Sequence, residues 1–334
     1  MDEKKITVKS PANIAFIKYW GQKDEKEIIP YNDSFSMNLS HCFTMVTVEL
    51  QEDAVIQELY IKDYKSTVFE RSTGESLKRV IDFYSKVRSL LDAKAVFGFR
   101  IYSENSFPKK AGIASSASFF SGLTRAFLKG FGMELPERQI SILARLSGSG
   151  SACRSIPDGF CWWKKGKNSA TSYAETIAPP DFWALRDIVL ILSSREKTVS
   201  SQEGHRYAKT SPFFFPRLKG IARRTESIRR AFFRKDLEEF GAILEQETIS
   251  LHTVMMTQSP PLYYWSGKTI ETIKKIVQFR KKGIPHYFTI DAGENIHIIC
   301  EKKDEKRIAE YYKNQPEVEE ILINYPVVGS RILS

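Results

Sequence analysis

The chain contains few cysteines and no long apolar run, and both shortages narrow the range of proteins it can be. Its 334 residues include only four cysteines, and no two of them have the CxxC spacing of a zinc site or a disulfide framework. Such scattered thiols are typical of a reducing cytosol. No apolar run reaches the roughly 18 residues of a membrane-spanning helix, and the polar opening MDEKKITVKS lacks the apolar segment of a secretory signal. We therefore expect a cytoplasmic protein without a membrane anchor.

Several short catalytic motifs are also missing. The sequence has no GxSxG nucleophile elbow, no Gly-Lys-Ser/Thr of a Walker A loop and no GxGxxG dinucleotide-binding fingerprint. None of the five histidines has a partner at metal-ligand spacing, so the pattern predicts no dedicated metal site. Cys153 adjoins Arg154, but no base is recognisable beside it, and we interpret Cys153 as a packing residue rather than a nucleophile.

A formal net charge of +10 leaves three kinds of anionic partner open: nucleic acid, anionic lipid and small polyanionic substrates. The basic residues occur in short pairs, such as Arg223-Arg224 and Arg229-Arg230, which are typical of solvated helix faces. No arginine-rich arm, RNP-like aromatic motif or zinc finger accompanies them. The excess charge suits an enzyme that handles multiply charged phosphates, and a basic nucleic-acid-binding module is the rival interpretation from another class.

Residue patterning predicts an α+β protein. With 42% hydrophobic residues the chain can fill a sizeable core. The domain division is expected just before Leu185, which gives domains 1–183 and 184–334. The polar segment 10–40 is expected to be irregular. Apolar residues at helical spacing indicate helices at about 77–91, 136–146, 213–250, 267–282 and 304–314, and β-rich runs indicate strands at 43–50, 97–105 and 185–194 with a hairpin over 286–302.

Residues 107–122, FPKKAGIASSASFFSG, combine small residues with the start of a helical apolar stripe. The small residues Gly112, Ala114, Ser115 and Ser116 therefore lie at a helix N-terminus, where unpaired N–H groups and the helix dipole favour an anion. They let the backbone approach a phosphate closely, and the two hydroxyls can bond phosphate oxygens or cap the helix. An ordinary serine-rich helix start is the alternative interpretation.

Three further stretches carry residue types suited to phosphate chemistry. Lys18, flanked by aromatics in NIAFIKYWG, is either a snorkelling surface lysine or a point charge beside phosphates or a catalytic carboxylate. The run SGSGSACRS, at 147–155, is either a flexible linker or a row of N–H and hydroxyl donors ending in Arg154, whose guanidinium suits a phosphate or a carboxylate. Asp291, in the turn sequence DAGEN, is either an Asx-turn former or a catalytic carboxylate.

Taken together and in this order, five blocks resemble the mevalonate diphosphate decarboxylase family of the GHMP kinase superfamily. The blocks are PANIAFIKYWG, NSFPKKAGIASSAS, SGSGSACRS, SSREKTVSSQEG followed by KTSPFF, and IDAGEN. Many superfamily kinases share the second block, whereas IKYWG with GSGSACRS and DAG points to the decarboxylase branch. The resemblance covers about residues 8–300. It implies an N-terminal ribosomal-protein-S5-like α+β domain and a C-terminal ferredoxin-like domain, with the active site in the cleft between them.

The resemblance also implies a reaction and a set of site residues. ATP, with magnesium, phosphorylates the tertiary 3-hydroxyl of mevalonate 5-diphosphate, and loss of phosphate and carbon dioxide leaves isopentenyl diphosphate. Asp291 would orient or deprotonate the hydroxyl, Lys18 would keep Asp291 ionised, and Arg154 would hold the substrate carboxylate. Homodimers are expected. The substrate residues implied are Asn13, Tyr19, Trp20, Gly21, Gln22, Arg79, Ser149, Gly150, Ser151, Ala152, Cys153, Ser201 and Gln202, and the ATP residues implied are Pro108, Gly112, Ala114, Ser115 and Ser116, with Ser116 a candidate magnesium ligand.

Two departures from the family pattern bear on the substrate. Gln22 stands where the family usually has lysine, and Gln202 follows Ser201 where many bacterial members have Ser-Arg. Both positions are expected on the diphosphate side, where a lost buried cation costs about 1–3 kcal/mol of affinity. Lys23 could replace the missing lysine by a small loop shift. Mevalonate 5-phosphate therefore stays open as the substrate, and a mevalonate 3-kinase and an RNA-binding S5-like module are the remaining alternatives.

Overall fold

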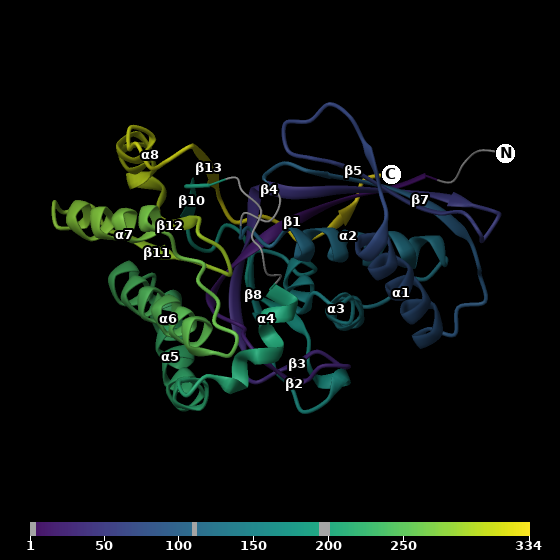
Figure 1. Ribbon diagram of the computed structural model, residues 1–334, viewed down its shortest axis with the longest axis horizontal. Helices are drawn as coiled ribbons and strands as arrows, with labels where there is room; N and C mark the ends of the chain where they lie inside the picture. Colours follow the sequence, from purple (N-terminus) through teal and green to yellow (C-terminus); the bar gives the residue numbers. More distant parts are fainter. Residues whose placement is uncertain (1–4, 109–111, 194–200) are drawn as a thin grey trace.

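The structure is a computed structural model that describes residues 5–108, 112–193 and 201–334, with residues 201 and 202 described by their backbone alone. Two sheets form its frame, and helices cover their faces (Figure 1). The predicted α+β class is confirmed. Within the described residues, no helix has both the length and the apolar character that crossing a bilayer requires.

The larger sheet has eight strands and a helical layer on one face (Figure 1). This half of the molecule contains β1 (Lys5–Ile17), β4 (Ser34–Gln51), β5 (Gln57–Lys62), β6 (Glu70–Ser72), α1 (Gly74–Leu90), β7 (Gly98–Asn105), α2 (Ser115–Gly130), α3 (Glu137–Arg145), η1 (Gly150–Ser155), β8 (Phe160–Trp163), η2 (Ser169–Thr171), β9 (Ala174–Ala178) and β14 (Arg331–Ile332), together with a small hairpin of β2 (Gln22–Asp24) and β3 (Ile29–Pro30). The strand order is β14-β1-β4-β7-β5-β6, and β8 and β9 extend the sheet from β4. Because side chains alternate along a strand, Val46 and Val48 of β4 face the helices and pack in one core with Leu123 and Phe127 of α2.

The second sheet has four antiparallel strands in the order β11-β12-β10-β13. Its half contains β10 (Leu185–Ile191), α4 (Ser201–Tyr207), η3 (Ala208–Thr210), α5 (Phe214–Arg234), α6 (Leu237–Thr257), α7 (Gly267–Arg280), β11 (His286–Thr289), β12 (Ile296–Glu301), η4 (Lys302–Asp304), α8 (Glu305–Lys313) and β13 (Glu320–Asn324). The aliphatic run of β10 is buried on both faces. Ile188 and Leu190 pack with α7 and α8, whereas Val189 and Ile191 face the first sheet and helices α5 and α6.

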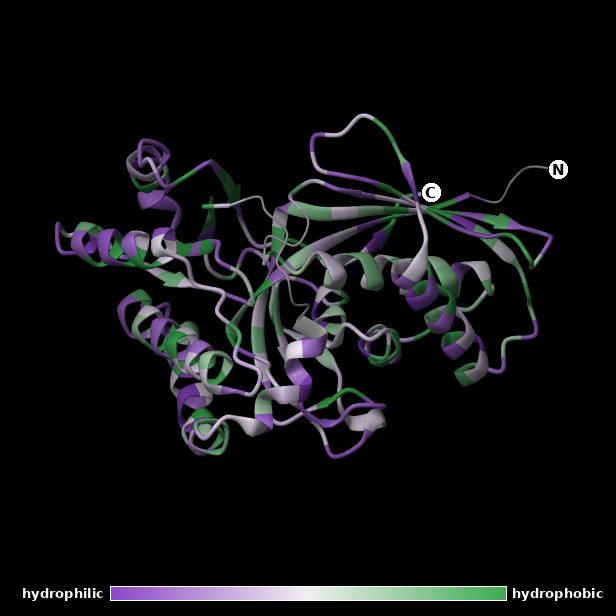
Figure 2. Ribbon diagram, viewed as in Figure 1, coloured by the Kyte–Doolittle hydropathy of each residue, from purple (hydrophilic) through white to green (hydrophobic). Residues whose placement is uncertain are grey.

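The two halves share one hydrophobic core. Phe16 of β1 packs edge-on against Phe35 of β4 and Phe240 of α6, with ring centroids 5.0 Å apart in each pair. Phe35 makes the same contact with Phe232 of α5, and Val189 of β10 belongs to this cluster. Figure 2 shows hydrophobic residues running through the central strands, while the outer helices mix hydrophobic and hydrophilic residues. The division at 183/184 stays a prediction, and the last strand, β14, returns to pair with β1.

One sequence prediction of the secondary structure is refined and another is wrong. The helical region expected over about 213–250 is confirmed, but it is divided into two helices, because Lys235 adopts a left-handed conformation (φ 56°) and Asp236 caps α6 by accepting the Glu239 N–H. The segment expected to be irregular over 10–40 lies mostly in the four strands β1 to β4. Its polar residues fit buried strands because they find partners: Asn38, for example, donates to the carbonyl of Pro157.

Candidate active site

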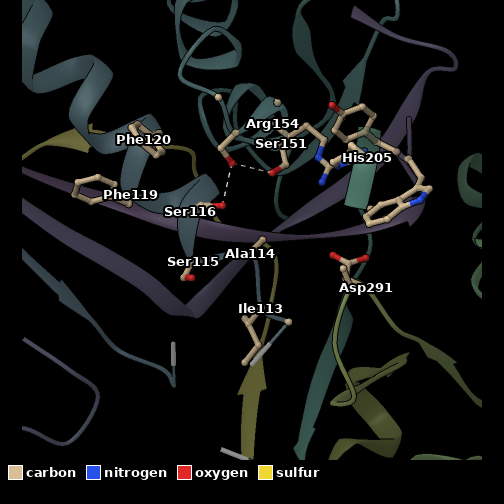
Figure 3. Close-up of a pocket in the computed structure, with 18 of the residues that line it drawn as sticks. Ile113, Ala114, Ser115, Ser116, Phe119, Phe120, Ser151, Arg154, His205 and Asp291 are labelled. Carbon is tan, nitrogen blue, oxygen red and sulfur yellow. Dashed lines mark hydrogen bonds between the residues drawn. The ribbon is translucent and has the colours of Figure 1, made fainter. Parts of the chain in front are cut away.

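A cavity of about 450 Å³ lies between the two halves, where the four chemistry-bearing stretches of the sequence converge. Figure 3 shows Ser115 and Ser116 on one side of it, with Ser151, Arg154 and Asp291 on the others. These side chains come from elements far apart in the chain: the start of α2, the 3₁₀ helix η1 and the turn between β11 and β12. Convergence at one cavity favours the functional interpretation of each stretch over its local alternative.

Lys18 and Asp291 form an ion pair at the wall of this cavity. The Nζ–Oδ1 distance is 2.5 Å, and the side chains are 1% and 19% exposed respectively. Lys18 follows the last residue of β1, and Asp291 follows β11. Burial alone raises the pKa of Asp291, but the charge and hydrogen bond of Lys18, helped by Arg154, outweigh it and lower that pKa. Asp291 is therefore an ionised carboxylate with one oxygen held by Lys18.

Arg154 is buried in η1 and held rigidly. Its Nε donates to Oδ1 of Asn13 over 3.0 Å, and its Nη1 donates to Oγ of Ser34 over 2.5 Å. Asn13 in turn donates to Ser155 over 2.8 Å, so the amide fixes the guanidinium from behind. The Nη2 group has no partner among the residues that the structure describes, and Arg154 lines the cavity. That amino group is available to an anionic group of a bound molecule.

The start of α2 offers a phosphate-sized recess. Among the described residues no side chain caps this helix, and its N-cap residue, Ala114, has a left-handed backbone (φ 51°). Gly112 also has a positive φ of 82°, and a Cβ atom there would lie 3.2 Å from the Cα of Gly293 in the turn that carries Asp291. Small residues therefore leave the first N–H groups of α2 open toward the cavity, as an anion requires. The residues present fit the triphosphate of a nucleotide.

A row of serine hydroxyls connects this recess to η1. Oγ of Ser116 lies 3.0 Å from Oγ of Ser149, which lies 3.4 Å from Oγ of Ser151 (Figure 3). No group of three or more His, Cys, Asp or Glu side chains suited to a metal occurs in the described part of the chain. Magnesium binds proteins through few ligands when phosphates supply the others, so a hydroxyl such as Ser116 beside the phosphate recess suits a nucleotide-borne magnesium ion.

The structure brings most of the predicted site residues to the cavity but not all of them. Fourteen of the predicted residues line the cavity: Lys18, Tyr19, Trp20, Gln22, Arg79, Gly112, Ala114, Ser115, Ser116, Ser149, Gly150, Ser151, Arg154 and Asp291. Five others do not line it: Asn13, Gly21, Pro108, Ala152 and Cys153. Cys153 packs with Trp163 and Ala174, and burial raises the pKa of its thiol to about 12. The side chains of Ser201 and Gln202 fall outside the described residues. Lys23 is exposed on β2 and does not line the cavity.

His205 is a cavity residue that the sequence motifs did not single out. Its ring stacks on Tyr19 with centroids 4.2 Å apart and lies 4.4 Å from the Trp20 ring. Its Nδ1 accepts the Gly21 N–H over 2.9 Å, which leaves the ring proton on Nε2. A single histidine on a short helix, 184 positions from its partner, has no sequence signal of its own. The family block that ends in SSQEG stops at Gly204, one residue before His205, and this proximity is the sequence signal that could have indicated His205.

Comparison with known proteins finds relatives along nearly the whole chain. The family model of the diphosphomevalonate decarboxylase-like N-terminal domain matches residues 10–174, and that of the mevalonate 5-diphosphate decarboxylase C-terminal domain matches residues 187–325. The chain is similar to the diphosphomevalonate decarboxylase of Debaryomyces hansenii, with 32% identity over 90% of this chain and 80% of the relative.

Solved structures agree with these relatives. The mevalonate diphosphate decarboxylase from Staphylococcus aureus has a TM-score of 0.91 and 30% identity to this chain, and the match covers 99% of this chain and 98% of that one. A structure of MDDEF in complex with MVAPP, AMPPCP and magnesium has a TM-score of 0.89 and 31% identity, with 99% of each chain covered. AMPPCP is an analogue of ATP, so that relative binds a nucleotide and magnesium.

Proposed function

Because the chain belongs to the diphosphomevalonate decarboxylase family, we infer that it catalyses the ATP-dependent decarboxylation of mevalonate 5-diphosphate to isopentenyl diphosphate. It is an ATP-dependent lyase with the GHMP kinase fold, and its reaction belongs to the mevalonate pathway of isoprenoid biosynthesis. The single observation that supports this function best is the Lys18–Asp291 ion pair in a cavity that also holds Arg154 and the open start of α2.

In the proposed mechanism, Asp291 prepares the 3-hydroxyl of the substrate. Its ionised carboxylate accepts the hydroxyl proton as the oxygen attacks the γ-phosphorus of ATP, and ADP departs. Lys18 keeps the carboxylate charged before the proton arrives and offsets negative charge on the phosphates afterwards. A tertiary alcohol is a poor leaving group, so this phosphorylation makes the next step possible.

Arg154 is assigned to the substrate carboxylate. When the C3–O bond to the new phosphate breaks, its electron pair leaves with the phosphate and positive charge develops at C3. The C1–C2 bond then breaks, carbon dioxide leaves, and the freed electron pair forms the C2=C3 double bond. The guanidinium, fixed by Asn13 and Ser34, orients the C1–C2 bond for this elimination through its free amino group.

ATP is assigned to the start of α2. Its phosphates would accept the N–H groups of the first turn beside Gly112 and Ala114, with Ser115 and Ser116 as hydroxyl donors. Magnesium, when bound with the nucleotide, would neutralise the charge that builds on the β- and γ-phosphates, and Ser116 is the candidate ligand from this chain. The hydroxyl row from Ser116 to Ser151 supports adjacent sites for nucleotide and acid.

The function is tested by measuring ADP and carbon dioxide after purified protein and magnesium-ATP are mixed with one substrate at a time. The three substrates are mevalonate, mevalonate 5-phosphate and mevalonate 5-diphosphate. We expect ADP and carbon dioxide in equal amounts from the diphosphate. If ADP forms but none of the three substrates releases carbon dioxide, the protein is a 3-kinase and the decarboxylase assignment is overturned. Salt-sensitive RNA binding without any ATP turnover would support the nucleic-acid alternative.

The 5-phosphate is a second candidate substrate because of Gln22. This residue lines the cavity, and its amide donates to the Tyr19 hydroxyl over 2.6 Å, so an uncharged side chain occupies the place of the family lysine. Gln22→Lys is expected to lower KM for the diphosphate about tenfold or more, with less effect on the 5-phosphate and little on kcat, because a new charged contact with phosphate is worth about 1.5–3 kcal/mol.

Steady-state kinetics with both substrates measures this preference, and Lys23→Gln is the matched control. Lys23 is the next residue on β2 but is exposed and outside the cavity lining, so its loss should leave both KM values unchanged. An unchanged ratio of the two KM values in Gln22→Lys would show that position 22 does not face the terminal phosphate.

The working state of the enzyme is also a proposal. A cytoplasmic homodimer with its domain boundary at 183/184 agrees with the family resemblance, and the four cysteines are free and buried. Analytical ultracentrifugation at micromolar concentration tests the dimer.

A further inference from the structure

The backbone of Lys18 is held by side chains rather than by a neighbouring strand. The chain leaves β1 at Ile17, so the peptide groups of Lys18 lie beyond the sheet ladder. The Lys18 N–H donates to Oε1 of Glu247 over 3.2 Å. Its carbonyl accepts from Nη2 of Arg217 and from Nδ2 of Asn32, each over 3.1 Å. Both main-chain groups of the active-site lysine are therefore bound by side chains from other parts of the fold.

Arg217 and Glu247 form a buried ion pair across helices α5 and α6. The two side chains are 1% and 0% exposed, and the same Nη2 of Arg217 that reaches Lys18 donates to Oε1 of Glu247. The other oxygen of Glu247 accepts from Nε of Arg224 over 2.9 Å. One arginine amino group and one carboxylate oxygen thus form a clamp on the peptide groups that flank the Lys18 side chain.

This clamp is a costly way to join two helices. Taking two charges out of water costs several kcal/mol each, and apolar residues of similar size often serve stability as well or better. Moreover, Nε and Nη1 of Arg217 are buried and make no hydrogen bond within the described part of the chain. Packing of α5 on α6 could be achieved by apolar side chains alone. Fixing the position of a polar backbone segment requires polar side chains, because an apolar side chain cannot form hydrogen bonds with its N–H and C=O groups.

We propose, on the basis of the proposed function, that the Arg217–Glu247 pair positions Lys18 against Asp291. Arg217 and Glu247 are therefore positioning residues for the phosphorylation step. Neither side chain lines the cavity, and both act through the Lys18 main chain. The Lys18 side chain is buried among packed neighbours and has little room to readjust, so the 2.5 Å contact between its Nζ and Asp291 depends on the position of the main chain. A misplacement of about 1 Å at a reacting group can cost about 100-fold in rate.

Loosening the clamp is expected to raise the pKa of Asp291. If Nζ retreats from Asp291, the lowering influence of Lys18 on the Asp291 pKa weakens while burial still raises it, so that pKa rises. Asp291 acts as a base only when ionised, so the acidic limb of the kcat–pH profile should move to higher pH. The other charged or titratable groups around the pair are Arg154, Glu247, His252 and His297, and the substitutions tested below leave the side chains of Arg154, His252 and His297 in place.

Arg217→Met is the sharpest variant, because Glu247 keeps Arg224 and Lys18 keeps Asn32. We expect kcat to fall about tenfold or more with KM values within about twofold, and the acidic limb to move up by about one pH unit. Arg217→Lys retains a charged donor and should recover part of both effects. Carbon-13 NMR titration of the Asp291 carboxyl should show the same upward shift without any turnover, and this measurement remains possible in a weakly folded variant at reduced temperature.

Arg280→Met is the matched control. Arg280 makes a two-point ion pair with Glu245, two residues before Glu247 on the same helix, through contacts of 2.6 and 3.1 Å, but it touches no cavity residue. Its loss should lower the thermal midpoint without moving the acidic limb or the Asp291 titration. An Arg217→Met enzyme whose limb and titration match those of wild type would overturn the positioning role. If the wild-type enzyme releases no carbon dioxide, the proposed function is overturned. The positioning role of the clamp is then tested by the NMR titration of Asp291 alone, compared between wild type and Arg217→Met.

Discussion

Asp291→Asn is expected to lower the rates of ADP and carbon dioxide formation together, with a loss in kcat of about 10³-fold, or about 4 kcal/mol of barrier. Asparagine has nearly the same shape and can still accept a hydrogen bond from Lys18, but it cannot accept the proton of the 3-hydroxyl. ATP should bind with nearly unchanged affinity, because its assigned contacts lie at the start of α2. Coupled ADP assay, carbon dioxide release and calorimetric titration with ATP measure the three quantities.

Glu294→Gln is the matched control for Asp291→Asn. It removes one negative charge from the same turn, three residues further on, and its side chain does not line the cavity. Its turnover should remain within about twofold of wild type, because Glu294 is half-buried and lies outside the cavity lining. Normal turnover by Asp291→Asn would show that Asp291 is neither the base nor the group that orients the hydroxyl.

Lys18→Met should produce the second large effect, a fall in kcat of about 10²–10³-fold together with a changed pH dependence. Methionine fills most of the buried volume but removes the cation. Burial raises the pKa of Asp291, and without the charge of Lys18 to lower it, that pKa rises. Because the base form must be ionised, residual activity should increase as pH increases over a range in which the wild-type enzyme is already constant.

The kcat–pH profile of Lys18→Met, with Lys275→Met beside it, checks this expectation. Lys275 pairs with Glu317 over 2.7 Å in the second half of the molecule, away from the cavity, so its loss should change neither the rate nor the profile. If Lys18→Met loses activity without any shift of the acidic limb, the lysine acts on the phosphates alone and does not set the charge state of Asp291.

The reacting groups could be predicted from the sequence because each is carried by a local motif. Lys18, Arg154 and Asp291 each lie in a short block with unusual composition, and their order along the chain matches one family. The structure adds their convergence on one cavity and the distance between Lys18 and Asp291. Their catalytic roles rest on the proposed function and the variants above.

The residues behind the reacting groups could not be predicted in the same way. Arg217 and Glu247 stand on helices rich in charge, and a charged residue on an amphipathic helix ordinarily faces water. Only the packing of α5 and α6 on the end of β1 reveals that these two point inward. Likewise, the break between α5 and α6 depends on one left-handed residue, Lys235, whose type gives no warning because lysine rarely adopts that conformation.

The aromatic contacts that join Phe16 and Phe35 to Phe232 and Phe240 have a consequence for folding. They place side chains from the first fifty residues and from the last third of the chain in one apolar cluster, so neither half can exclude water from that cluster by itself. Both halves should therefore melt together in a single calorimetric transition, and fragments 1–183 and 184–334 expressed separately should expose this surface and aggregate. Two architectural units would then behave as one cooperative thermodynamic unit.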